Sequence, residues 1–241
     1  MGHFLPFYPK HAAQFGFDGI MVDGEHRAWD AREVQSMIAF HHLADVDCLW
    51  RPPTLEKSGL YRLLEDGVAG LIIPFVDDAA KAHRLVEAVK FPPLGNRGMD
   101  GAGLDVAFTL GTPNYREEAN RETCLIGQIE TTEALANVET IVATPGIDVL
   151  FIGPGDLAMR LGTKASIKEP VFHDAQKRVA AAARKHGKAW GRPAFDVEDA
   201  RILKEEGAQL IVMGNDFVGL YQHLRETQER LDTALGKESK A

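Results

Sequence analysis

Two carboxylates, Glu130 and Asp156, each stand at the end of a short apolar segment. The first segment begins at Leu125 and the second at Val149. Aliphatic and β-branched runs of this length are typical of buried strands, so each acid is expected at the C-terminal edge of a strand. A carboxylate in such a poorly solvated place needs a cation or hydrogen-bond donors beside it.

The spacing of the two acids corresponds to about one strand–helix–strand unit. Their strands are therefore expected to be parallel neighbours whose carboxylate oxygens converge. Neither strand carries a Lys or Arg at the matching edge. A metal ion explains the pair more readily than a salt bridge does, and Glu130 and Asp156 are the candidate ligands.

Short apolar segments alternate with helical patterns along the chain, as in residues 79–89. This alternation predicts a parallel sheet covered by helices, and eight units predict an α/β fold closed into a (β/α)8 TIM barrel. An open doubly wound sheet is the alternative, but no Gly-x-Gly-x-x-Gly follows the first strand. The expected strands are 3–7, 19–23, 48–51, 70–76, 125–130, 149–152, 189–193 and 210–214.

Composition narrows the class of protein. A chain of 241 residues suits one barrel domain, 1–241, in which 217–235 forms a helix and 236–241 a frayed tail. The 27 basic and 35 acidic residues show no basic stripe, so nucleic acid is not an expected partner. No segment approaches the ~18 apolar residues of a membrane span, and no signal peptide is expected. Cys48 and Cys124 are interpreted as buried thiols, which favours the cytoplasm.

Reactive side chains gather at the ends of the expected strands. Asp23, Glu25 and His26 follow one strand, and Arg51 ends the next. In barrels of this class chemistry occurs at the C-terminal strand ends. Each residue alone is more often a hydrogen-bonded structural group, but their agreement on one rim favours a catalytic site.

Five motifs now identify a family. In order, the motifs are Asp23-Gly-Glu-His26, Arg51-Pro, Pro92-Pro-Leu-Gly-x-Arg-Gly98, Gln128-Ile-Glu-Thr131 and Gly153-Pro-Gly-Asp-Leu157. With these motifs the chain resembles the HpcH/HpaI aldolases, the metal-dependent class II pyruvate aldolases such as 2-keto-3-deoxyglucarate aldolase, from about residue 2 to 220.

The resemblance implies a role for each residue of the metal site. Glu130 and Asp156 match the two protein ligands of a divalent cation, for which Mg²⁺, Mn²⁺ or Co²⁺ suits an all-oxygen shell. Asp23 and Glu25 match the acids that hold the metal-bound waters, and Asp23 also orients the catalytic histidine.

The same resemblance implies the reaction and its remaining groups. His26 matches the general base and Arg51 the cation beside the keto oxygen. A 4-hydroxy-2-oxo acid would be cleaved to an aldehyde and pyruvate or hydroxypyruvate. No Arg stands between Arg97 and Arg116, so a neutral hydroxyaldehyde is expected rather than a charged one.

Substrate binding and assembly complete the expectations from the resemblance. The backbone N–H groups of Gly155 and Asp156 match those that hold the pyruvate carboxylate. Gln128 and Pro154 are further candidates for substrate contact, as is Glu65, which stands where relatives carry an Asp near the site. Relatives form hexamers, built as trimers of dimers with an exchanged C-terminal helix.

Three alternatives compete with this hypothesis. A Schiff-base aldolase needs a Lys at a strand's C-terminal end, and Lys188 lies at the opposite end of its strand. A CoA-ester lyase of the citramalyl- or malyl-CoA type needs a nucleotide pocket, for which no basic or Gly-rich feature is found. A non-catalytic barrel that binds 2-keto acids predicts decayed motif positions, yet all five motifs are filled.

Overall fold

The computed structural model describes residues 1–109 and 111–237. Seven parallel strands form one sheet within these residues, and each strand pairs with its neighbours in sequence, in the order β1 to β7. The strands are β1 (Gly19–Asp23), β2 (Asp47–Arg51), β3 (Gly70–Ile73), β4 (Cys124–Ile129), β5 (Val149–Ile152), β6 (Ala189–Ala194) and β7 (Leu210–Met213).

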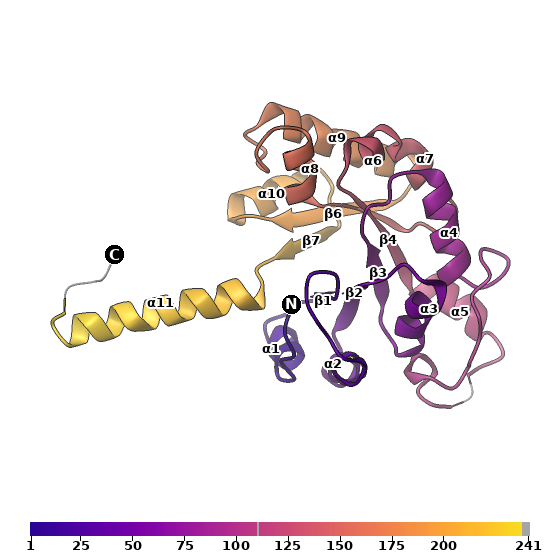
Figure 1. Ribbon diagram of the computed structural model, residues 1–241, viewed down its shortest axis with the longest axis horizontal. Helices are drawn as coiled ribbons and strands as arrows, with labels where there is room; N and C mark the ends of the chain where they lie inside the picture. Colours follow the sequence, from indigo (N-terminus) through magenta and orange to yellow (C-terminus); the bar gives the residue numbers. More distant parts are fainter. Residues whose placement is uncertain (110, 238–241) are drawn as a thin grey trace.

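Helices connect the strands and cover the outer face of the sheet (Figure 1). Several begin at a capping side chain: Asp30, Asp78 and Asp196 accept hydrogen bonds from backbone N–H groups of the first turn. The helices are α1 (Tyr8–Gln14), α2 (Ala31–Ala44), α3 (Lys57–Glu65), α4 (Ala79–Val89), α5 (Tyr115–Glu122), α6 (Thr132–Ala136), α7 (Val138–Val142), α8 (Pro154–Arg160), α9 (Pro170–Lys185), α10 (Val197–Glu205) and α11 (Asp216–Ala234), with a 3-10 turn at Leu104–Val106.

The alternation of side chains along each strand determines which polar residues face the interior of the barrel at its C-terminal rim. Ile72, Ile126 and Phe151 form a small buried cluster against which Met21 and Leu49 pack. Side chains alternate along a strand, so the residues two positions further on face the same interior. Asp23 follows Met21, Arg51 follows Leu49, and Gln128 and then Glu130 follow Ile126. Strand periodicity therefore directs these four polar side chains inward at the C-terminal rim.

The first expected strand, 3–7, is wrong, because these residues form a turn that leads into α1. Pro6 has no N–H for a strand ladder. Met1 instead lies beside β1: its amino nitrogen is 2.6 Å from the carbonyl oxygen of Met21, and its carbonyl oxygen accepts from the N–H of Asp23 at 2.9 Å. The first residues thus occupy the position of an eighth strand, and the seven-stranded (β/α)8-like barrel is nearly closed.

The C-terminal part departs from the compact body. The helix expected over 217–235 is present as α11, which projects from the barrel in Figure 1. The expected frayed tail, 236–241, lies outside the described residues from position 238 onward. In the described part of the chain, no helix has both the length and the apolar character of a membrane span.

Candidate active site

The ends of β1 and β2 place a connected group of charges on the rim. Asp23 and Arg51 are register partners, and Arg51 Nη2 lies 2.9 Å from Asp23 Oδ1 while Nη1 lies 3.2 Å from Glu25 Oε2. Burial disfavours the Asp23 carboxylate, but Arg51 and the backbone N–H of His26 favour it more, and the pKa of Asp23 lies below 3.8. Arg51 is therefore held in place by two carboxylates.

His26 stands at the outer side of this group. Its ring is largely exposed, and Nε2 lies 3.5 Å from Glu25 Oε2. The sequence resemblance assigned the orienting role to Asp23. The contact between the two residues runs through the backbone, since Asp23 Oδ1 accepts from the His26 N–H at 3.2 Å. The acid beside the imidazole itself is Glu25.

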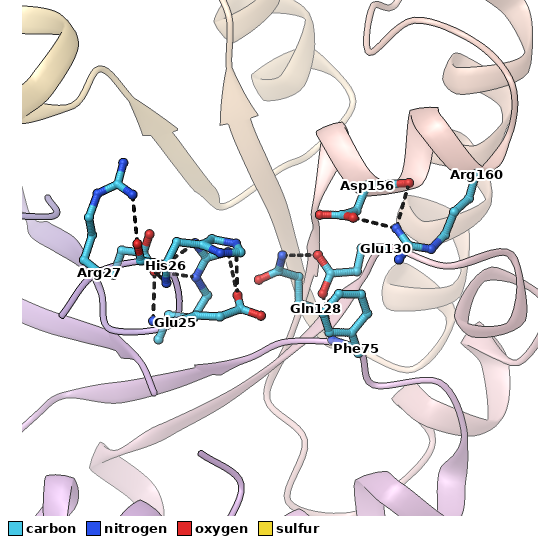
Figure 2. A network of polar contacts seen from close by, with 10 residues as sticks. Glu25, His26, Arg27, Phe75, Gln128, Glu130, Asp156 and Arg160 are labelled. Atoms are coloured by element: carbon cyan, nitrogen blue, oxygen red, sulfur yellow. Dashed lines mark hydrogen bonds and ion pairs between the residues drawn. The ribbon is translucent and has the colours of Figure 1, made fainter. Parts of the chain in front are cut away.

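Glu130 follows β4 and is almost completely buried. Its Oε1 accepts from the backbone N–H of Phe75 at 2.7 Å, and its Oε2 accepts from the Gln128 amide (Figure 2). Phe75 has a positive φ of 52°, a conformation that a non-glycine residue rarely adopts. This conformation accompanies the hydrogen bond that Phe75 donates to Glu130, and the sequence analysis did not identify it.

Asp156 lies in the first turn of α8, which begins directly after β5. The close approach of the Glu130 and Gln128 side chains explains the glycine at position 153, directly after β5. A Cβ on Gly153 would lie 2.3 Å from Glu130 Oε2 and 2.6 Å from Gln128 Nε2. Only glycine leaves room for the Glu130 carboxylate at this position.

The electrostatics of Glu130 suit a cation. Burial is the largest cause that raises its pKa above 4.5, and the carboxylates of Asp156 and Glu25 raise it further against the hydrogen bonds from Phe75 and Gln128. The buried Oε1 atom of Gln128 has no hydrogen-bond partner. The carboxylate oxygens of Glu130 and Asp156 are donors of the kind that fits a hard divalent cation.

No cluster of three or more His, Cys, Asp or Glu side chains suited to a metal occurs in the described residues. Glu130 and Asp156 would therefore hold a cation as a pair and leave its other coordination positions to water and substrate. Of the residues expected at the substrate, Pro154 and Gly155 lie in the first turn of α8 beside Asp156, and Gln128 lies beside Glu130.

The cation beside Asp156 is Arg160, which lies on α8 and not at a strand edge, where the sequence patterns showed no Lys or Arg. Arg160 Nη1 lies 2.6 Å from Asp156 Oδ1, and the guanidinium carbon lies 5.4 Å from the centroid of the Phe75 ring (Figure 2). Asp156 and Arg160 are four residues apart on α8. The i, i+4 spacing of an acid and an arginine on one helix was the signal that could have revealed the pair.

Glu65 does not lie near Glu130 and Asp156 in the folded chain. It ends α3, which runs back from the C-terminal end of β2 to the start of β3, so it lies toward the opposite end of the barrel. There it lines a cavity of about 730 Å³ together with Arg62, Asp66 and Asp100. Burial is the main cause of the raised pKa of Glu65.

A nearly closed parallel barrel with carboxylates, a histidine and an arginine at its C-terminal rim defines a TIM-barrel enzyme site. The family model described as HpcH/HpaI aldolase/citrate lyase matches residues 6–222, and the chain belongs to this family.

Similar proteins agree with this assignment. The chain is 33% identical over 225 residues to a hydroxypyruvate/pyruvate aldolase of Pseudomonas aeruginosa, covering 93% of this chain and 84% of the relative. It is also 33% identical to a 5-keto-4-deoxy-D-glucarate aldolase of Klebsiella pneumoniae, covering 92% and 85%. The crystal structure of an HpcH/HpaI aldolase from Desulfitobacterium hafniense superposes with a TM-score of 0.89 at 28% identity, covering 95% and 89%.

Proposed function

We propose that this protein is a divalent-metal-dependent pyruvate aldolase, a carbon–carbon lyase. It cleaves a 4-hydroxy-2-oxo acid reversibly to an aldehyde and pyruvate or hydroxypyruvate. The observation that carries the proposal is the buried Glu130 carboxylate, which lies beside Asp156 at the rim of a barrel whose family relatives are named as aldolases of this kind.

Each charged or titratable residue of the site has its own role in the proposed reaction. Glu130 and Asp156 would hold a Mg²⁺, Mn²⁺ or Co²⁺ ion, which would supply a Lewis acid for the negative charge that develops on the substrate. His26 accepts the proton of the 4-hydroxyl, directly or through a water, as the C3–C4 bond breaks. The electron pair of that bond passes into the pyruvyl half as an enolate, which Arg51 faces.

The surrounding groups support these roles. Asp23 and Glu25 hold the Arg51 guanidinium, so the cation is positioned before substrate arrives. Glu25 lies beside the His26 ring and can stabilise the imidazolium that forms. The first-turn N–H groups of Gly155 and Asp156 lack partners within α8 and are the proposed binding place of the substrate carboxylate.

Metal-dependent release of pyruvate from a 4-hydroxy-2-oxo acid tests the proposal. Turnover is expected with Mg²⁺ or Mn²⁺ and not after chelation. The variants Glu130→Gln and Asp156→Asn are expected to lose activity. Glu133→Gln, which changes an exposed acid in the first turn of α6, is the matched control. Full turnover in metal-stripped enzyme would contradict the proposal, and so would turnover of a CoA thioester alone.

Assembly and location form part of the same proposal. We place a single barrel domain, 1–241, in a hexamer built as a trimer of dimers in the cytoplasm. The exposed apolar side chains of α11 support assembly through this helix, and the free thiols of Cys48 and Cys124 agree with a reducing compartment. Small-molecule 2-keto acid and aldehyde are the proposed partners.

A further inference from the structure

Arg160 is the positive charge in direct contact with Asp156. Its Nη1 lies 2.6 Å from Asp156 Oδ1 and 3.2 Å from the Asp156 carbonyl oxygen. Side chains on a helix tilt toward its N-terminus, so Arg160, at the last turn of α8, reaches back to the site at the first turn. Figure 2 shows the guanidinium on the side of Asp156, across Glu130 and Gln128 from His26.

The ring of Phe75 fixes the place of this guanidinium. The guanidinium carbon lies 5.4 Å from the ring centroid, and the backbone N–H of the same Phe75 donates to Glu130. Phe75 therefore donates a hydrogen bond to Glu130 and packs its ring near the guanidinium that pairs with Asp156. The position of Arg160 is tied to the metal site by two independent contacts.

We propose that Arg160 is the counter-ion of Asp156 and opposes the binding of a divalent cation to this carboxylate. The inference rests on the proposed metal site and concerns what this chain adds to it. The Arg160 guanidinium lies 2.6 Å from the Asp156 carboxylate, and it would repel a divalent cation bound to the same carboxylate. The two cations therefore compete for Asp156. Arg160 thus lowers the affinity of the site for metal.

The test is binding of Mn²⁺ to the full-length protein, followed by the electron paramagnetic resonance of free Mn²⁺. Arg160→Gln is expected to bind Mn²⁺ about twofold to fivefold more tightly than the original protein, the range of a partly exposed ion pair. Arg160→Lys keeps a charge four residues from Asp156 and is expected to stay within about twofold of the original affinity.

Arg201→Gln is the matched control, because Arg201 also pairs with an acid four residues away, Glu205, but on α10 and outside the site. Its affinity for Mn²⁺ is expected to remain unchanged. Equal or weaker Mn²⁺ binding by Arg160→Gln overturns the inference. Absence of Mn²⁺ binding to the original protein overturns the metal site itself, so the two failures are distinguishable.

Thermal unfolding supplies a second readout that does not depend on activity. Without metal, Arg160→Gln leaves the Asp156 carboxylate without its partner, and the Tm is expected to fall by about 1–4 °C. In saturating Mg²⁺ this difference is expected to disappear, because the tighter binding of Mg²⁺ by Arg160→Gln offsets the lost ion pair. A difference that persists unchanged in Mg²⁺ would assign Arg160 a purely structural role.

Discussion

Glu130 combines almost complete burial with a carboxylate that faces other carboxylates. Two hydrogen bonds, from Phe75 and Gln128, are its local compensation, and they do not restore the ordinary pKa of the group. The ionised side chain therefore destabilises the metal-free protein until a cation neutralises it. The ionised Glu130 carboxylate therefore lowers the free energy of unfolding of the protein without metal, while the same charge favours metal binding.

Glu130→Gln is expected to raise the free energy of unfolding of the metal-free protein at neutral pH by about 1–2 kcal/mol, since it removes the buried charge. The Gln128 amide group can rotate by about 180°, so that its unpaired Oε1 accepts a hydrogen bond from the amide introduced by Glu130→Gln. Urea unfolding in the presence of a chelator measures the change. A clear loss of stability would show that the charge at this position is already compensated.

The pH dependence of metal binding follows from the same shift. The pKa of Glu130 is raised above 4.5, so the folded protein takes up this proton before the unfolded chain does as the pH falls. The destabilisation from ionised Glu130 is thus relieved on acidification. The metal competes with the proton, and its affinity is expected to decline already above pH 4.5. Titration with Mn²⁺ at several pH values checks this, with Arg201→Gln expected to give the same profile.

His26 and Arg51 carry the chemistry in the proposed mechanism. His26→Ala or Arg51→Ala is expected to lower kcat by about 10²–10⁴, because each removes a group that acts on the developing charge. Circular dichroism and Mn²⁺ binding establish that each variant is folded and holds metal. A variant with near-normal kcat would lose its assigned role.

At the scale of the element, β6 carries an arginine that binds the covering helices and does not face the candidate site. Arg192 lies on β6 near the rim but points outward between α9 and α10. There it is fully buried and bonds Gln176 and both carboxylate oxygens of Asp199. Its guanidinium also lies 5.8 Å from the ring centroid of Phe172. This arginine connects a strand to its covering helices and takes no part in the site.

Arg192→Ala is expected to lower the free energy of unfolding by about 3–5 kcal/mol, because it leaves the buried Asp199 carboxylate without its partner. Arg201→Ala, which breaks exposed ion pairs on α10, is expected to leave the free energy of unfolding nearly unchanged. Urea unfolding of both variants measures the difference. Similar effects in the two variants would contradict the assignment of Arg192 as a buried anchor.

At the scale of the whole molecule, α11 is held to the described part of the barrel at its first turn, where Asp216 lies 2.8 Å from His3 Nδ1, and its later apolar residues are exposed. Phe217, Leu220, Tyr221 and Leu224 are each about 60% exposed and follow one face at i, i+3, i+4 and i+7. A helix with such a face is expected to bury it against another surface. The projecting position of α11 in Figure 1 agrees with exchange of this helix between subunits.

Light scattering after gel filtration tests the assembly. The full chain is expected to have a mass several times its 26.5 kDa, and the double variant Leu220→Glu/Leu224→Glu is expected to shift toward the mass of one chain. Gln222→Glu adds a charge to the same helix at a polar position and is the control. A 26.5 kDa species for the unchanged chain would exclude assembly through α11.

Local patterns already contained most of the strand positions and the inward-facing residues of the rim. The apolar run that ends in Glu130 and the alternation that aligns Asp23 and Arg51 are properties of a few consecutive residues, and the barrel preserves them. The five motifs likewise identified the family that residues 6–222 match.

Contacts between distant segments determined the rest. Met1 takes the position beside β1 that residues 3–7 were expected to fill, through backbone contacts with Met21 and Asp23 that no local pattern predicts. The outward direction of Arg192, the remote place of Glu65 and the Phe75 ring beneath Arg160 also depend on packing between elements. Sequence periodicity specifies the face of an element on which a side chain lies. Only the folded chain specifies what that face meets, because the contact joins residues far apart in sequence.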